Sequence, residues 1–129
     1  MVAVDTNVLI RLVVADHAAQ SARAAAVFRS GSVFIAKSVL LEAEWVLRHS
    51  YELGSEAVLR ALRGVLGLDN VVMEDPTAVA TALRLLEKGI DFADALHIAS
   101  SAQVDRFMTF DARLAKRAAR VSRLEVALA

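Results

Sequence analysis

Four short apolar segments, separated by longer helix-forming stretches, constrain the fold of this chain more than any other feature. The segments are Val2–Val4, Gly31–Ala36, Asn70–Glu74 and Arg106–Phe110, and Arg123–Leu128 is a candidate terminal edge strand. Strands that are apolar throughout and alternate with helices pair in parallel, with helices on both faces of the sheet. The sequence therefore predicts an α/β fold built on a parallel sheet.

Helices are expected between these strands, and the residues at their ends predict where they begin and end. The expected helices are Val8–Val14, Asp16–Arg29, Ser38 to about Tyr51, Ser55–Leu66, Pro76–Glu87, Asp91–Val104 and Ala112–Arg120. Thr6 or Asn7 is expected to cap the first helix, and Ser38 the third. Pro76 suits a first helical position, and Gly89 is expected to close the helix that Pro76 opens.

The composition indicates one compact domain over residues 1–129, because 57% of the residues are hydrophobic and no linker or repeat interrupts them. No apolar run approaches the roughly 20 residues that span a bilayer, and the N-terminus lacks signal-peptide features. The absence of cysteine excludes disulfides and thiolate metal sites, and suits a cytoplasmic protein. A formal net charge of zero excludes a basic field over the whole surface.

Two of the predicted strands are followed by a carboxylate. Asp5 follows the first strand and Asp111 follows the fourth. Ligands of open α/β sheets bind beyond the carboxyl ends of the strands, so both side chains are candidates for a functional site. The alternative is that each aspartate only caps the helix that follows it.

Two further carboxylates stand at the start of the helix expected over Asp91–Val104. Asp91 suits the N-cap position, and Asp94 lies three residues on, on the same helical face. Because Asp91 is sufficient as a cap, Asp94 is free for a functional role; alternatively, it only interacts with the helix dipole. His97 is expected to form hydrogen bonds rather than to bind metal, because no second histidine stands at a metal-binding spacing.

The helix expected from Ser38 carries two glutamates, which helical geometry separates. Glu44 has Arg48 four residues on, the spacing of a solvated surface ion pair. Glu42 has no basic residue at such a spacing and lies beside the apolar stripe of the helix. Glu42 is therefore the glutamate without an evident structural role.

The carboxylates of Asp5, Glu42, Asp94 and Asp111 together predict a metal site. Clustered carboxylates repel one another unless a cation neutralises them. Ligand sets made only of oxygen favour Mg²⁺ or Mn²⁺ over zinc. Such an ion lowers the pKa of a bound water and polarises a phosphoryl oxygen, which predicts metal-assisted hydrolysis of a phosphodiester.

Four stretches of the sequence resemble the acidic motifs of PIN-domain ribonucleases, and most of all those of VapC-type toxins of bacterial toxin–antitoxin pairs. The stretches are "VDTNVLI", "SVLLEAEWVL", "DFADALHIA" and "FMTFDARLA", and the resemblance covers essentially the whole chain. It implies a three-layer α/β/α sandwich with a parallel four- to five-stranded sheet. It also implies a Mg²⁺ or Mn²⁺ site and endoribonuclease activity that a cognate antitoxin inhibits.

The resemblance further implies roles for single residues. The acids that match metal-binding and catalytic carboxylates are Asp5 and Asp94 as central ligands, Glu42 on the helix between them, and Asp111 as a more variable fourth. Asn7 and Thr109 match polar residues that support the site, whereas Asp91 has no firm assignment.

An RNA substrate requires a local basic patch, and one candidate follows Asp111. Its residues, Arg113, Lys116, Arg117 and Arg120, recur at helical spacing on one face. The alternative is a solvated basic face whose charges suit the C-terminal end of a helix, and both interpretations can hold together.

A protein partner is expected as well, because the mean hydropathy of +0.47 is high for a small domain with few aromatic residues. The candidate contact residues are Leu41, Trp45, Leu62, Leu66 and Leu68. They predict a homodimer, with a further groove for an amphipathic antitoxin segment. The alternative is that these leucines belong to the core.

Two other classes of protein share parts of this pattern. A haloacid-dehalogenase-like phosphatase also starts from an aspartate after the first strand, but it needs a second acid where this chain has Asn7. A non-catalytic interaction module, in which the acids only cap helices, is the other alternative.

Overall fold

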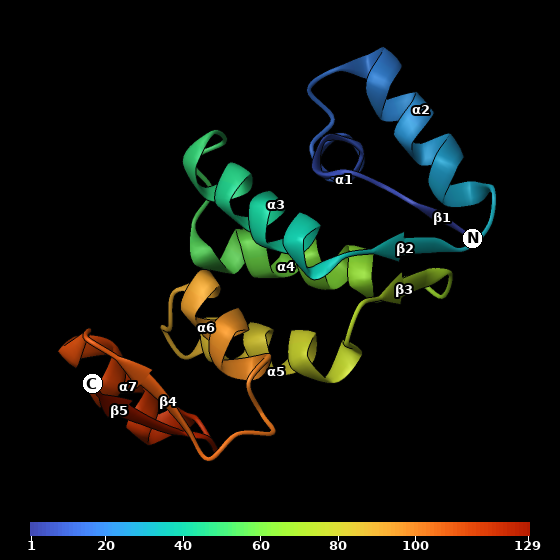
Figure 1. The fold of residues 1–129 in the computed structure, drawn as a ribbon. Helices are drawn as coiled ribbons and strands as arrows, with labels where there is room; N and C mark the ends of the chain where they lie inside the picture. The colour runs from blue at the N-terminus through green and yellow to red at the C-terminus, as the bar shows by residue number, and fades with distance from the viewer. The chain divides into compact units, whose positions relative to one another are not determined.

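The computed structural model describes residues 1–129, and the chain divides into two compact units, Met1–Pro76 and Thr77–Ala129. Strands alternate with helices in both units, and the paired strands run parallel to each other (Figure 1). The predicted α/β fold is therefore confirmed. The strands form a three-stranded sheet in the first unit and a two-stranded sheet in the second. A single continuous sheet and a single domain over the whole chain stay predictions.

The first unit contains a parallel sheet of order β1-β2-β3 with its helices. The elements are β1 (Val2–Ala3), α1 (Thr6–Val13), α2 (Ala18–Arg29), β2 (Val33–Ile35), α3 (Lys37–His49), α4 (Ser55–Leu66) and β3 (Val71–Met73). Val33 of β2 pairs with Val2 of β1 and with Val71 of β3. Helix α1 packs against α2 and α3, and α3 packs against α4. Because the strands are parallel and in register, their carboxyl ends meet at one edge of the sheet.

The second unit is built around one β–α–β connection. The elements are α5 (Pro76–Glu87), which begins at the boundary between the units, α6 (Phe92–Ala99), β4 (Arg106–Thr109), α7 (Ala112–Val121) and β5 (Glu125–Leu128). Strands β4 and β5 pair in parallel, and α7 packs against both of them. Leu85, Ile90 and Phe92 are among the buried core side chains of this unit. The predicted terminal strand is thus confirmed as β5.

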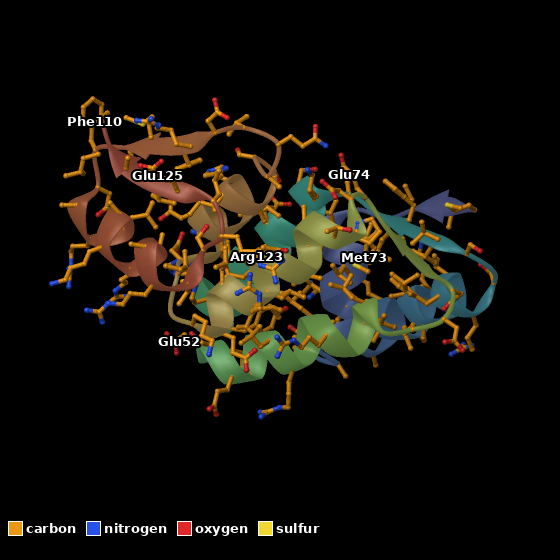
Figure 2. All side chains as sticks on the ribbon, turned by 90° about the horizontal axis from the view of Figure 1, so that it is seen from below. Glu52, Met73, Glu74, Phe110, Arg123 and Glu125 are labelled. Carbon is orange, nitrogen blue, oxygen red and sulfur yellow. The ribbon has the colours of Figure 1, made fainter.

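The predicted bounds hold where local signals decide them. Helix α4 spans Ser55–Leu66 and α5 spans Pro76–Glu87, as predicted. Helix α6, by contrast, ends at Ala99 rather than Val104, because polar residues follow and the Ser101 hydroxyl donates to the carbonyl oxygen of His97 at 2.8 Å. Strand β4 ends one residue early, and Phe110 projects from its end with 90% of its surface exposed (Figure 2).

Three helix starts differ from prediction because another residue caps the helix, and the first is α1, which begins at Thr6 rather than Val8 with Asp5 as its N-cap. Helix α2 begins at Ala18 rather than Asp16, because His17 Nδ1 accepts from the backbone N–H of Gln20 at 3.2 Å. Helix α3 begins at Lys37, and Ser38 is not its cap. Instead Glu74, which follows β3 (Figure 2), accepts from the Lys37 N–H with Oε1 at 2.8 Å. None of the helices is both long and apolar enough to cross a membrane.

Candidate active site

Asp5 follows β1 after one intervening residue, Val4, and is the N-cap of α1, a position the sequence assigned to Thr6 or Asn7. Its Oδ1 accepts from the backbone N–H of Val8 at 3.1 Å. Thr6 is instead buried in the first turn, and Asn7 is exposed beside it. Asp5 therefore does cap the helix that follows it, and its role as a ligand stays a prediction. Because this bond uses one carboxylate oxygen, Asp5 can cap the helix and bind a ligand at the same time.

Asp111 has the same arrangement at the end of β4. Its Oδ1 accepts from the backbone N–H groups of Arg113 at 2.9 Å and Leu114 at 3.0 Å, which caps α7. The Thr109 hydroxyl accepts from the backbone N–H of Asp111 at 3.0 Å. Thr109 thus shapes the turn that carries Asp111, while the second carboxylate oxygen stays outside the capping bonds.

Asp94 lies in the first turn of α6, and its surroundings raise the pKa of its carboxyl group. Partial burial raises the pKa of Asp94 most, and the nearby charge of Asp91 raises it further. His97 lowers this pKa, and Asp111 raises it. Asp91 and Asp111 therefore lie near enough to Asp94 for their charges to act on its pKa. Asp91 occupies the N-cap position, but its side chain makes no capping hydrogen bond, so the argument that Asp91 caps this helix is wrong.

The two glutamates of α3 lie in opposite environments. The predicted pair of Glu44 with Arg48 is present at 2.8 Å, but Glu44 is buried rather than solvated. Glu42 is exposed, and no hydrogen bond or ion pair engages its side chain. It lies about 8 Å along the helix axis from Lys37, where α3 begins at the carboxyl edge of the sheet. The structure agrees with the prediction that Glu42 has no structural role.

The four proposed ligands divide between the units, with Asp5 and Glu42 in the first and Asp94 and Asp111 in the second. Within neither unit do three carboxylate or imidazole groups gather closely enough to hold a metal ion. The donor set nevertheless fits a hard cation. It is made of oxygen atoms alone, and both burial and neighbouring carboxylates oppose the charge of Asp94.

Two acidic residues at the same edge of the first sheet escaped the sequence analysis. Glu74 and Asp75 follow β3, where Glu74 caps α3 and Asp75 pairs with Lys37 Nζ at 3.5 Å. Asp75 adopts a left-handed backbone conformation with φ of 52°. Asp75 carried the signal used for Asp5 and Asp111, because it directly follows the predicted strand Asn70–Glu74, whereas Glu74 was assigned to that strand.

The basic residues of α7 line a hollow of about 490 Å³ in the second unit. Its lining residues are Lys88, Arg113, Lys116, Arg117, Arg120 and Val121. Arg117 Nη1 donates to the carbonyl oxygen of Gly89 at 3.0 Å, which ties α7 to the turn that closes α5. Gly89 has a φ of 96°, a conformation suited to glycine at a helix end. Lys88 is a member of this basic group that the sequence analysis missed.

Comparison with known proteins gives the family. No curated protein matches the chain in sequence. Among solved structures, Mycobacterium tuberculosis VapC20, a Sarcin-Ricin loop cleaving toxin, is 20% identical, with a TM-score of 0.46. That match covers 85% of this chain and 88% of VapC20. The family model of the PIN domain matches residues 2–120, which is nearly the whole chain and includes all four proposed ligands. This chain therefore belongs to the PIN-domain family.

Proposed function

We propose that this chain is a Mg²⁺- or Mn²⁺-dependent endoribonuclease of the VapC type, which hydrolyses RNA phosphodiester bonds and is inhibited by a cognate antitoxin. The observation that carries the proposal is the position of the motif acids within the PIN match. Asp5 and Asp111 each follow a parallel strand and cap the next helix, and Asp94 lies in the first turn of α6. The carboxyl ends of strands, near which Asp5 and Asp111 stand, are where α/β sheets bind ligands.

Asp5, Glu42, Asp94 and Asp111 are the residues that would hold the divalent ion. When bound, the ion supplies a water of lowered pKa and neutralises charge on the reacting phosphate. The protein itself orients the carboxylates that would hold this ion. The capping bonds of Asp5 and Asp111 fix each carboxylate while leaving one oxygen outside those bonds. Asn7 is proposed to support the site beside Asp5, and Thr109 does so by holding the turn at Asp111.

The basic hollow on α7 is the proposed contact for the RNA backbone. Arg113, Lys116 and Arg120 are exposed on it, and no carboxylate pairs with them. Because α7 begins directly after Asp111, these cations lie on the element that also carries a proposed ligand. Lys and Arg side chains that bind phosphates release counterions, which gives much of the affinity for nucleic acid.

A homodimer and an antitoxin are the proposed protein partners. Trp45 and Leu68 are 53% and 43% exposed, whereas Leu62 lies in the core. The alternative that the leucines are core therefore holds for Leu62 and not for Leu68, while Leu41 and Leu66 are half-buried. Sedimentation at micromolar concentration tests the dimer, and a monomer without concentration dependence would refute it.

The decisive experiment incubates a purified RNA pool with the chain in Mn²⁺, in Mg²⁺ and in EDTA, and maps the new ends. Internal cuts are expected with metal and not with EDTA, and Asp94→Asn is expected to make none. Binding of RNA without cleavage by the wild type would favour the interaction module. Hydrolysis of p-nitrophenyl phosphate in place of RNA would favour the phosphatase, against the expectation from Asn7.

A further inference from the structure

A surface hollow of about 280 Å³ lies between helices α1 and α2, and Asp5 is one of the residues that line it. Its apolar lining is Val8, Ala24 and Val27, and its polar lining includes Asn7, Gln20 and Arg23. The volume lies just below the roughly 300–1,000 Å³ of ordinary ligand pockets. A hollow of this size suits one small, partly apolar group rather than a folded segment.

The hollow follows from two helical faces that meet. On α2, Gln20, Arg23, Ala24 and Val27 recur at the spacing of one face, and on α1 Asn7 and Arg11 stand one turn apart. The small side chain of Ala24, which is buried, leaves room between the larger residues on either side of it. This face of α2 therefore lines the hollow and places polar side chains around it.

A hydrogen-bond network fixes the orientation of the Gln20 amide. Arg11 Nε donates to Gln20 Oε1 at 2.7 Å, while Arg11 Nη1 donates to Asp16 at 3.2 Å and to the Tyr51 hydroxyl at 2.9 Å. Tyr51 in turn donates to Asp16 at 2.8 Å. Because the arginine occupies the oxygen of the Gln20 amide, the amide nitrogen is left as an oriented donor. A fixed donor beside apolar surface selects ligands by their hydrogen-bond pattern.

Arg23 adds a positive charge to the same hollow. Its side chain is exposed, and no carboxylate pairs with it. An arginine without a partner binds phosphate well, because its planar group donates two parallel hydrogen bonds. The hollow thus combines apolar surface for the face of a ring, amides for its edge, and a cation for a phosphate.

We infer that this hollow binds one nucleobase of the RNA strand, next to the phosphate that reacts at Asp5, and so determines the cleavage sequence. The inference rests on the proposed function. Gln20 reads the base edge as a donor, Asn7 offers a second amide, and Arg23 holds the adjoining phosphate. An unpaired base suits this role because its edge and face are both open to a protein.

Binding of fluorescent RNA hexamers, measured by anisotropy in EDTA, tests the inference without requiring cleavage. The probes are oligo(A), oligo(C), oligo(U) and an abasic hexamer that keeps the phosphates. Wild type is expected to bind at least one base-containing hexamer about three- to tenfold more tightly than the abasic one, the worth of about one hydrogen bond. Gln20→Glu keeps an acceptor for Arg11 but removes the donor, so the preference among the bases is expected to change.

Arg23→Ala is expected to weaken all four hexamers alike, and to reduce the slope of log affinity against log salt by about 0.7. Arg29→Ala is the matched control, because Arg29 is exposed on the same helix but does not line the hollow. Equal affinity of wild type for the abasic and all base-containing hexamers would overturn the inference. So would an unchanged base preference in Gln20→Glu, an outcome that assigns the hollow to another occupant such as a peptide.

The experiments can refute the nuclease assignment and the base site independently of each other. If the wild type cleaves RNA with Mn²⁺ but the hexamer preferences do not depend on Gln20, only the base site is wrong. If Gln20→Glu changes the preferences but no RNA is cut with either metal, the base site stands and the nuclease assignment is wrong. Circular dichroism of each variant verifies that the fold is kept.

Discussion

Glu44 and Arg48 form an ion pair in which the carboxylate is buried. Glu44 Oε2 accepts from Arg48 Nε at 2.8 Å, Oε1 accepts from Nη2 at 3.2 Å, and Glu44 is only 2% exposed. Removing the Glu44 side chain deletes both of these hydrogen bonds and leaves a cavity at a buried position. We expect Glu44→Ala to lower the free energy of unfolding by about 2 kcal/mol, because Arg48 is only partly buried. Urea unfolding measures this, and a change under about 0.5 kcal/mol would contradict it.

The matched substitution on the same helix is Glu42→Gln. Because Glu42 is exposed and unpaired, its loss is expected to change the free energy of unfolding by less than about 0.5 kcal/mol. The same substitution is expected to abolish RNA cleavage. Glu44→Gln is expected to reduce stability while keeping activity per folded molecule. Equal loss of activity in the two variants would refute the distinction between these glutamates.

Asp94 is expected to make stability depend on pH. Burial and then Asp91 raise the pKa of Asp94, with a further increase from Asp111 and an opposing effect of His97. Between the ordinary pKa and the raised one, the folded protein keeps a proton that the unfolded chain releases. The free energy of unfolding is therefore highest, as far as Asp94 is concerned, at acidic pH. It falls as the pH rises and Asp94 loses its proton in the folded state.

Without metal, Asp94→Asn is consequently expected to be more stable than wild type near neutral pH. The difference is expected to vanish below about pH 3.9, where the carboxyl is protonated in both states. Urea unfolding across this pH range in EDTA gives the comparison. A variant less stable than wild type at neutral pH would show that Asp94 has a structural role instead.

In the presence of a divalent metal, wild type is expected to be more stable than Asp94→Asn. An ion that binds only the folded state at ten times its dissociation constant adds about 1.4 kcal/mol to the free energy of unfolding. For a chain of this length, that raises the melting temperature by about 5 °C. Mn²⁺ is expected to raise the melting temperature of wild type but not of Asp5→Asn or Asp94→Asn. An equal rise in all three proteins would place the ion elsewhere.

The cap that Glu74 provides for α3 is expected to contribute to stability. Glu74→Ala leaves the Lys37 N–H without its acceptor, which is expected to cost about 1 kcal/mol. Glu74→Gln keeps an oxygen acceptor and is expected to lose less than Glu74→Ala. Thermal unfolding of both variants measures the difference. Identical losses would show that the negative charge, and not the hydrogen bond, holds the start of this helix.

The basic hollow on α7 is expected to bind RNA through phosphates. Lys116→Ala and Arg120→Ala are each expected to weaken binding of all RNA sequences alike, and to reduce the salt slope by about 0.7 per contact. Arg60→Ala, on the exposed side of α4, is the control. Anisotropy at several salt concentrations measures both quantities. Unchanged slopes would mean that this face is only solvated.

Local sequence signals were sufficient to predict much of the fold of this protein. Pro76 and the apolar periodicity after it defined α5, and the bounds of α4 were equally clear from sequence. The carboxylates after the first and fourth strands were also evident, because strand and helix periodicity repeat within a few residues. These short-range patterns, together with the family motifs, were sufficient for the α/β fold and for the residues of the proposed site.

Only the tertiary structure decided which side chains are buried and which residues, far apart in sequence, contact each other. Spacing predicted the pair of Glu44 and Arg48, but not that other elements bury Glu44. Glu74 caps a helix that begins 37 residues before it, and Gln20 is oriented by an arginine on another helix. Periodicity defines the face of a helix, whereas burial and partners depend on what packs against that face, and chain segments far apart in sequence supply that packing.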